Sequence, residues 1–207
     1  MPNKINKIKA IIFDWGGVCC QEGEPFASLH LQKKLSMNPE EIIEKVKDIY
    51  IDYYIGKYNR ETFWRAIMKY FHLKETPEIN PVALSDAYLN SYSVYQDVLD
   101  LALRLQKNYK VGLLSNLTPE MRDHIRSAHQ TEKYFKTEVY SCDKDVKVIK
   151  PEVKPFKVIL KKMKLPAKNC LFIDNSEKNT RAAAQLGFET ILFKNRPQLF
   201  KKIKKII

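Results

Sequence analysis

The chain of 207 residues carries 36 lysines and arginines against 24 acidic residues, which gives a formal net charge of +12. Its length suits one α/β core with a modest insertion, and no apolar stretch approaches the ~20 residues that a membrane span requires. The basic charge suits nucleic acid, an acidic membrane or a phosphorylated substrate, but solvated helix faces account for most of the lysines more simply, so a nucleic-acid partner is not expected.

Export and disulfide bonding are not expected either. The apolar run at residues 10–13 is too short for a signal-peptide core, and no small-residue cleavage site follows it. The cysteines form no CxxC pair, which argues against a zinc site: Cys19, Cys20, Cys142 and Cys170. We therefore expect a cytoplasmic protein with reduced thiols.

Four short apolar runs are typical of parallel strands that are buried on both faces. They span residues 10–13, 111–114, 171–173 and 190–193. Each of the first three runs ends in a polar residue, and these are Asp14, Ser115 and Asp174. Since ligands of open α/β sheets bind outside the carboxyl ends of the strands, these three side chains are candidates for one site.

The stretch between the first two strands contains no convincing strand and several helix starts. Asn38-Pro39-Glu40-Glu41 combines an N-cap with a proline and acids in the first turn, Asn59 can open a second helix, and Pro81 precedes a third. We predict a Rossmann-like, doubly wound parallel α/β core with an inserted all-helical cap domain. The expected boundaries are residues 1–18 and 93–207 for the core, and 19–92 for the cap.

The later part of the chain carries helices with readable ends. Thr118 is a candidate N-cap before Pro119 and Glu120. Ser176 can cap a helix that stops at Gly187. These helices begin just after the polar residues that end the strands, so they present free backbone N–H groups to the same site.

Four motifs follow one another in order, and the ordered set is far more specific than any one of them. They are KAIIFDWGGV with Asp14, VGLLSNLTPE with Ser115 and Asn116, VIKPEVKPF with Lys150, and CLFIDNSEKN with Asp174 and Asn175. This set resembles the haloacid dehalogenase-like superfamily over residues 8–18, 111–119 and 150–193. The helical insertion resembles the caps that small members of that family carry after the first motif.

The resemblance implies a magnesium-dependent phosphatase. Asp14 would attack the phosphorus of a small phosphorylated metabolite and form an aspartyl-phosphate, while Lys150 neutralises the charge that gathers there. Ser115 and Asn116 would bind the phosphate group. Mg²⁺ would be held by the carboxylates of Asp14 and Asp174 and by the backbone carbonyl of Gly16, with Asn175 beside this set.

Two positions depart from the family pattern. Gly16 stands where most phosphatases of the family have a second aspartate that acts as general acid and base, a loss of about 10²–10⁴ in rate for poor leaving groups. Glu22, Glu24 or water could replace it. Asn175 stands where many relatives have an aspartate, so weaker metal affinity is expected.

Each assignment has a simpler structural alternative. Asp14 can merely cap a turn, Ser115 can cap the following helix, and Lys150 can be one more surface lysine. Asp174 can be a structural carboxylate.

Two other functions fit part of the pattern. A metal-independent 2-haloacid dehalogenase-type hydrolase also lacks the second aspartate, but it fits Asp174 and the Gly16-Gly17 turn poorly. A degenerate, non-catalytic binding module of the same fold would explain why glycine replaces the second aspartate at position 16. Such a module would have little need for Asp14 and Lys150. The sequence does not name the substrate, because specificity is expected in the cap.

Overall fold

The computed structural model describes residues 8–205, so the first seven residues of the predicted core and the last two residues of the basic C-terminus lie outside it. Within that range five parallel strands form one sheet in the order β3-β2-β1-β4-β5. They are β1 (Ala10–Phe13), β2 (Lys110–Ser115), β3 (Thr137–Tyr140), β4 (Cys170–Asp174) and β5 (Glu189–Leu192). The chain builds outward from β1 on one side and then returns to add β4 and β5 on the other, so the strand order reverses beside β1.

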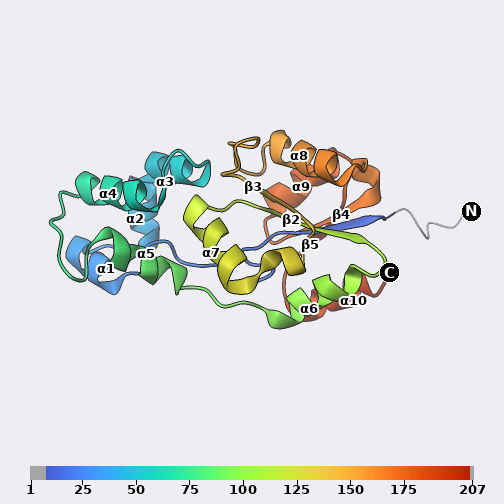
Figure 1. Ribbon diagram of the computed structural model, residues 1–207, viewed down its shortest axis with the longest axis horizontal. Coiled ribbons are helices and arrows are strands. Elements are labelled where there is room, and N and C mark those ends of the chain that lie inside the picture. Colours follow the sequence, from blue (N-terminus) through green and yellow to red (C-terminus); the bar gives the residue numbers. More distant parts are fainter. Residues whose placement is uncertain (1–7, 206–207) are drawn as a thin grey trace, which may run out of the picture.

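Helices cover both faces of the sheet (Figure 1). One face carries α6 (Gln96–Leu105), α7 (Pro119–His129) and α10 (Arg196–Ile203), and the other carries α8 (Val153–Met163) and α9 (Glu177–Gln185). The alternation of side chains along β1 explains the two layers, because Ile11 and Phe13 join the first core and Ala10 and Ile12 join the second. The predicted doubly wound α/β core is therefore confirmed.

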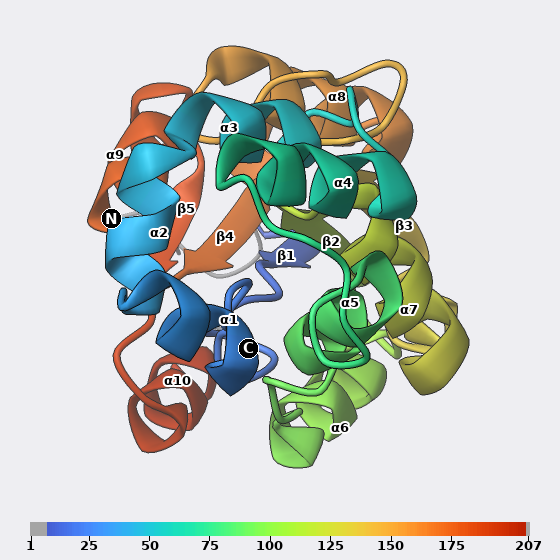
Figure 2. The ribbon, with the colours of Figure 1, turned by 90° about the vertical axis from the view of Figure 1, so that its left-hand side faces the viewer.

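Six helices lie between β1 and β2, and the first five of them gather at one end of the molecule (Figures 1 and 2). We call these five the cap: α1 (Leu29–Leu35), α2 (Pro39–Lys45), α3 (Lys47–Tyr54), α4 (Arg60–Tyr70) and α5 (Pro81–Leu89). The expected starts are present, because Asn38 and Asn59 form capping boxes at α2 and α4, and Pro81 is the first residue of α5. The segment is helical as predicted, whereas the domain boundaries at residues 18 and 92 stay predictions.

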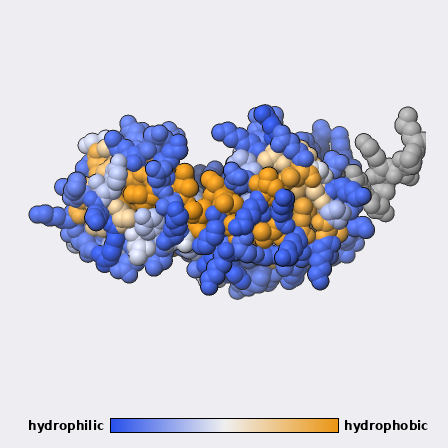
Figure 3. All heavy atoms as spheres, turned by 90° about the horizontal axis from the view of Figure 1, so that it is seen from above, coloured by the Kyte–Doolittle hydropathy of each residue, from blue (hydrophilic) through white to orange (hydrophobic). Residues whose placement is uncertain are grey.

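The cap has its own aromatic core and is joined to the sheet domain through a buried carboxylate. The rings of Tyr53 and Phe63 stack with centroids 4.0 Å apart. The Tyr53 hydroxyl donates a 2.5 Å hydrogen bond to Glu120 of α7, which also accepts from Ser85 of α5 and lies 3.3 Å from the Arg60 guanidinium. Seen from above, the outline narrows between the two lobes while apolar side chains continue across the middle of both (Figure 3).

The chain leaves and re-enters the core through two paired segments. The Gln21 backbone N–H donates to the Ser93 carbonyl at 2.8 Å, and the Tyr95 N–H donates to the Cys19 carbonyl at the same distance. Cys20 and Val94 form an antiparallel bridge between them. The two connections to the cap therefore lie side by side as a short ribbon.

The sheet differs from the sequence prediction at β3 and at several strand ends. Strands β2 and β4 are each one residue longer at both ends than expected. Strand β3 was not predicted, because Thr137 and Glu138 interrupt its apolar character at the edge of the sheet, where only Val139 and Tyr140 are buried. Strand β5 begins and ends one residue earlier than expected.

The basic C-terminal stretch forms α10, which buries Leu199 and Ile203 and leaves Lys201 and Lys202 in solvent. The lysines therefore lie on a solvated helix face, and the expectation that they bind no nucleic acid stays a prediction. Among residues 8–205, no helix is both long and apolar enough to cross a membrane.

Candidate active site

Asp14 follows β1 directly, and its carboxylate is buried at the carboxyl end of the sheet. Its backbone N–H continues the ladder to the Ile173 carbonyl at 2.9 Å. The Oδ1 atom accepts hydrogen bonds from the Ser115 hydroxyl at 2.6 Å and from the Trp15 N–H at 2.8 Å. Because Ser115 ends the neighbouring strand β2, the register of β1 and β2 brings these two side chains together. The cap of the following helix is Thr118, so Ser115 does not serve as that cap.

Lys150 lies between two carboxylates. Its Nζ atom is 3.0 Å from Asp14 Oδ2 and 2.7 Å from Asp174 Oδ2, and it donates a third bond to the Leu114 carbonyl at 2.9 Å. The side chain is 1% exposed, which excludes a surface lysine. An ammonium group held this way cancels part of the negative charge that two carboxylates bring into one buried place.

Asp174 ends β4 and is held by three donors in addition to Lys150. The Ser176 N–H donates to its Oδ1 at 2.7 Å, and the Asn179 side-chain amide donates to both oxygens, at 3.2 Å to Oδ1 and 3.0 Å to Oδ2. Sequence reasoning did not single out Asn179. The sequence feature that could have indicated Asn179 is its position as a polar residue in the first turn of the helix that Ser176 caps.

Asn116 is engaged with the lysine that it adjoins. Its Oδ1 accepts the Lys150 backbone N–H at 2.7 Å, and its Nδ2 donates to the Lys150 carbonyl at 3.1 Å. The amide thus fixes the loop that delivers Lys150, a role that the sequence did not indicate. Its predicted contact with phosphate stays a prediction, although the residue also lines the site cavity.

The glycine loop after Asp14 is shaped by Asn175. Gly17 has a φ of 73°, and a Cβ added there would lie 2.1 Å from the Asn175 Nδ2 atom, so only glycine allows this side chain to cover the loop. Gly16 is different, because a Cβ there would meet Glu22 at ordinary contact distances of 3.7–3.9 Å. Of the residues predicted at the metal site, Gly16 and Asn175 line the same cavity as Asp14, and Asp174 shares the Lys150 ammonium with it.

A cavity of about 280 Å³ opens in front of these residues. The cap contributes Tyr54 from the end of α3, and the connection into the cap contributes Glu22. The lining is completed by residues from the strand ends and the loops after them: Asp14, Gly16, Ser115, Asn116, Ile149, Asn175, Ser176 and Asn179. Asp174 and Lys150 lie beneath this lining rather than in it, and both are buried.

Burial controls the electrostatics of the site. Desolvation, with the charge of Asp174 adding to it, raises the pKa of Asp14 to about 7 despite the nearby Lys150 ammonium. Burial works to lower the pKa of Lys150, but the two carboxylates outweigh it and raise that pKa above its ordinary value. Burial also raises the pKa of the Cys19 thiol, which donates to the Asp14 carbonyl at 3.1 Å, so Cys19 is a packing residue.

The charge balance of the site suits a divalent cation. Asp14 and Asp174 contribute two buried negative charges and Lys150 one positive charge, which leaves a net negative site. The carboxylates and the Gly16 carbonyl are the hard oxygen donors that Mg²⁺ prefers. Within residues 8–205, no group of three or more His, Cys, Asp or Glu side chains is arranged as an all-side-chain metal cage. The donor chemistry therefore fits magnesium held by few protein ligands, as is usual for this ion.

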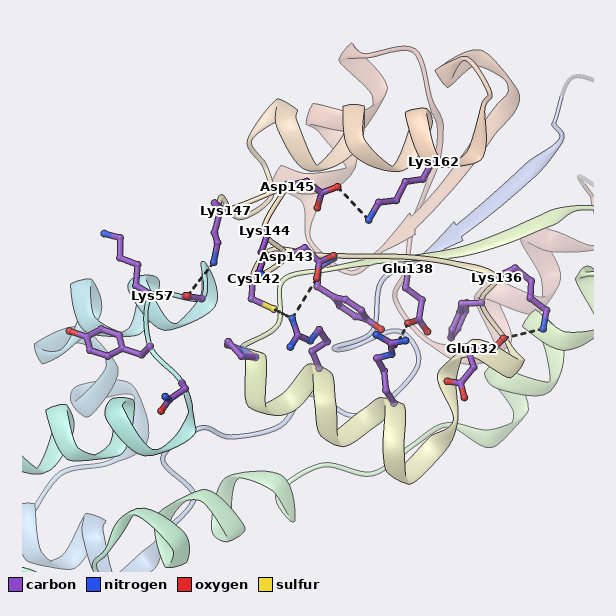
Figure 4. Close-up of a pocket in the computed structure, with 18 residues that line it drawn as sticks. Lys57, Glu132, Lys136, Glu138, Cys142, Asp143, Lys144, Asp145, Lys147 and Lys162 are labelled. Atoms are coloured by element: carbon purple, nitrogen blue, oxygen red, sulfur yellow. Dashed lines mark hydrogen bonds and ion pairs between the residues drawn. The ribbon is translucent and has the colours of Figure 1, made fainter.

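A larger cavity of about 830 Å³ lies between the cap and α7 and shares no lining residue with the first (Figure 4). Much of its charge is already compensated within its walls. The pairs are Arg122 with Asp143 at 3.6 Å, Arg126 with Glu138 at 3.4 Å, and Lys162 with Asp145 at 3.6 Å. Because Asp14 lines the smaller cavity and contacts Lys150 beneath it, we assign the candidate active site there.

The doubly wound parallel sheet and the cavity at its carboxyl edge, lined by Asp14, are typical of an α/β enzyme. The chain belongs to the haloacid dehalogenase-like hydrolases, since the model of that family matches residues 8–187. The resemblance seen in the four motifs is thereby confirmed. A comparison with curated proteins finds no match.

Solved structures share the fold at low sequence identity. A haloacid dehalogenase-like family enzyme of Bacteroides thetaiotaomicron, solved with magnesium and inorganic phosphate, is 24% identical, with a TM-score of 0.77 over 93% of this chain and 99% of that one. A predicted hydrolase of the family from Porphyromonas gingivalis is 23% identical, with a TM-score of 0.78 over 96% and 97%. The L-2-haloacid dehalogenase of Xanthobacter autotrophicus, with chloropropionic acid covalently bound, is 16% identical, with a TM-score of 0.62 over 97% and 84%.

Proposed function

We propose that this hydrolase is a magnesium-dependent phosphatase that cleaves a small phosphomonoester through an aspartyl-phosphate on Asp14. The observation that carries the proposal is the Lys150 ammonium held between Asp14 and Asp174, directly behind a polar cavity. A carboxylate that must meet an anionic phosphoryl group needs a fixed cation beside it. The Bacteroides structure, which contains magnesium and inorganic phosphate, is in keeping with this chemistry.

In this proposal Asp14 attacks the phosphorus, and the groups around it bind the phosphate and neutralise its charge. The Asp14 carboxylate attacks phosphorus, and the leaving oxygen departs on the opposite side of the phosphoryl group. Ser115, whose hydroxyl lies at Asp14 Oδ1, meets a phosphate oxygen brought to that carboxylate. Lys150 offsets the charge on Asp14 as the two anions approach. Asp14, Asp174 and the Gly16 carbonyl would hold Mg²⁺, which would supply a second positive charge to the phosphoryl oxygens.

The size of the cavity supports a small substrate. About 280 Å³ lies between the strand ends and Tyr54 of the cap, which is room for a phosphate group with a small organic portion. Tyr54 of the cap lines the cavity together with the strand-end residues, so a small phosphorylated metabolite suits the site better than a phosphoprotein or a nucleic acid.

A dehalogenase is the second candidate, because Gly16 supplies no second carboxylate and the Xanthobacter dehalogenase has the same fold. Displacement of halide from carbon leaves a stable anion and needs no proton donor. The buried Asp174 in contact with Lys150 favours the phosphatase, since a second carboxylate beside Asp14 provides a further hard oxygen ligand for Mg²⁺.

The test is hydrolysis of p-nitrophenyl phosphate with Mg²⁺ and with a chelator, beside Asp14→Asn as the matched control. Turnover that requires the metal and disappears in the variant is the expected result. Absence of turnover in both conditions, with release of chloride from 2-chloropropionate, would assign the dehalogenase instead. If neither substrate reacts while phosphate still binds, the protein is a non-catalytic binding module.

A further inference from the structure

We infer that Glu22 is the general acid and base of this site. It would protonate the leaving oxygen of the substrate and then deprotonate the water that hydrolyses the aspartyl-phosphate. The inference rests on the proposed phosphatase function and adds the proton carrier that Gly16 cannot supply.

The chemistry of a phosphomonoester creates the need for such a group. An alkoxide is a poor leaving group, and a positioned proton donor is worth about 10²–10⁴ in rate. Of the residues that line the cavity, Asp14, Glu22 and Tyr54 carry titratable side chains. Asp14 is engaged as the nucleophile. Burial raises the pKa of Tyr54 to about 12, and its hydroxyl pairs with that of Tyr50 at 3.0 Å, so Glu22 is the remaining candidate.

The position of the Glu22 carboxyl supports the assignment. The three atoms nearest to a Cβ built on Gly16 are Cγ, Oε1 and Cδ of Glu22, at 3.7–3.9 Å. A side chain at position 16, two residues beyond the nucleophile, would therefore point at the Glu22 carboxyl. Glu22 is also exposed to solvent, so it can exchange protons with water between turnovers.

The backbone on both sides of Glu22 is fixed, which places its side chain reproducibly. Cys20 bridges both Gly16 and Val94. On the other side the Glu24 N–H donates to the Ser91 hydroxyl at 2.7 Å. The Glu24 carboxylate itself accepts from the Phe26 N–H at 3.3 Å and is not part of the cavity lining. The structure thus selects Glu22 over Glu24.

The two half-reactions balance with one proton carried by Glu22. In the first, a bond forms between an Asp14 oxygen and phosphorus, the phosphorus–leaving oxygen bond breaks, and the Glu22 proton moves to that oxygen to give the free alcohol. In the second, the Glu22 carboxylate takes a proton from water as the water oxygen attacks phosphorus. The bond from phosphorus to Asp14 then breaks, which releases inorganic phosphate and restores both carboxyl groups to their starting states.

The test is rapid-mixing kinetics of Glu22→Gln with Mg²⁺ and two substrates. p-Nitrophenyl phosphate has a good leaving group, so the variant should release one equivalent of p-nitrophenol per site in a rapid burst and then turn over ~10²-fold more slowly than wild type. An alkyl phosphate such as glycerol 2-phosphate needs the acid in the first step. With the alkyl phosphate the variant should therefore show no burst, and its steady-state turnover should be ~10²-fold or more below that of the wild type.

Two further variants sharpen the experiment. Glu24→Gln is the matched control and should keep both rates within about threefold of wild type. Gly16→Asp combined with Glu22→Gln should regain at least tenfold in steady-state turnover, because the new carboxyl points into the same space. The burst shows that the nucleophilic site of Glu22→Gln is intact.

Unchanged steady-state rates in Glu22→Gln would overturn the assignment, and so would loss of the burst with p-nitrophenyl phosphate. Wild-type protein that turns over neither ester would overturn the phosphatase function itself, a result that is distinct from any failure of Glu22.

Discussion

The Lys150 ammonium lies 2.7 Å from the Asp174 carboxylate in a part of the molecule where both side chains are inaccessible to solvent. Lys150 comes from the loop before α8, and Asp174 comes from the end of β4, so the ion pair joins two elements of the core. Each group would be costly to bury alone, and removal of one partner leaves the other uncompensated. The same ammonium also faces Asp14, so one cation serves both carboxylates.

Lys150→Met should abolish most of the activity without removing the nucleophile. Loss of the fixed cation leaves two buried carboxylates facing each other, and we expect kcat to fall by about 10²–10³. Lys154→Met is the matched control, because Lys154 is exposed in α8 and should change kcat less than twofold. Equal kinetics of the two variants would contradict the role given to Lys150.

The pH dependence of stability should report the buried Asp14 in the metal-free protein. Its pKa rises from an ordinary 3.8 to about 7 because of burial, so between these values the unfolded chain releases a proton that the folded protein keeps. The stabilising effect is fully present below pH 3.8 and is lost as the pH rises to about 7, a change of ~4 kcal/mol at most. Asp14→Asn has no carboxyl group at this position and therefore lacks this pH-dependent contribution to stability. We expect urea unfolding with chelator to show that the free energy of unfolding falls less between pH 4.5 and pH 8 in Asp14→Asn than in the wild-type protein. Equal decreases in the two proteins would contradict the raised pKa of Asp14.

Magnesium should stabilise the wild-type protein in the absence of any substrate. An ion that binds only the folded state raises the unfolding temperature as its concentration increases. Removal of one proposed ligand in Asp174→Asn should reduce this increase strongly, whereas Glu177→Gln, in an exposed ion pair with Arg181, should leave it intact. The measurement is thermal unfolding over a magnesium titration. An equal increase in both variants would show that the ion binds elsewhere.

Gly17→Ala should damage both stability and activity. The residue has a φ of 73°, which costs roughly 1 kcal/mol for alanine, and the new methyl group would also collide with Asn175. Gly187→Ala separates backbone strain from collision. Gly187 has a φ of 92°, but a Cβ added there would lie 3.9 Å from its nearest neighbour, which is an ordinary contact. We expect similar backbone strain in both variants and loss of turnover only at Gly17. Partial recovery in Gly17→Ala with Asn175→Ala would confirm the collision.

Glu120→Gln should weaken the attachment of the cap to the core. The carboxylate accepts hydrogen bonds from Tyr53 and Ser85, and an amide there would set N–H groups against those donors. The expected loss is about 1–3 kcal/mol in the free energy of unfolding, read from denaturant titration. Glu61→Gln, which removes an exposed i,i+4 pair with Arg65, should cost less than ~1 kcal/mol. Similar losses would mean that Glu120 is not a special link.

The sequence specifies the site better than it specifies the contacts around it. Asp14, Ser115 and Asp174 were predictable because the carboxyl ends of parallel strands meet at one edge, and continuous apolar runs mark such strands. The edge strand β3 escaped prediction because half of it faces solvent. Asn179 and the backbone contacts of Asn116 depend on how one side chain turns within a folded loop, and no pattern of residue types encodes that.

The link between Glu120 and Tyr53 was equally hidden, because its two partners are 67 residues apart in the chain. Periodicity identifies a buried helix face, but it does not say which distant hydroxyl a carboxylate on that face accepts from. Such pairs become visible only when the cap and the core are placed together.

The paired ribbon at Gln21 and Ser93 has a consequence for how this enzyme can diversify. The chain departs and returns at neighbouring points, so another segment could be inserted between them without changing the path of the strands, provided that it also satisfied the buried Glu120 carboxylate. Glu22 and Tyr54 both lie within the present segment. A lineage that exchanged it would change the proposed proton carrier and one wall of the cavity in a single event, while Asp14, Lys150 and Asp174 remained in the part that was kept.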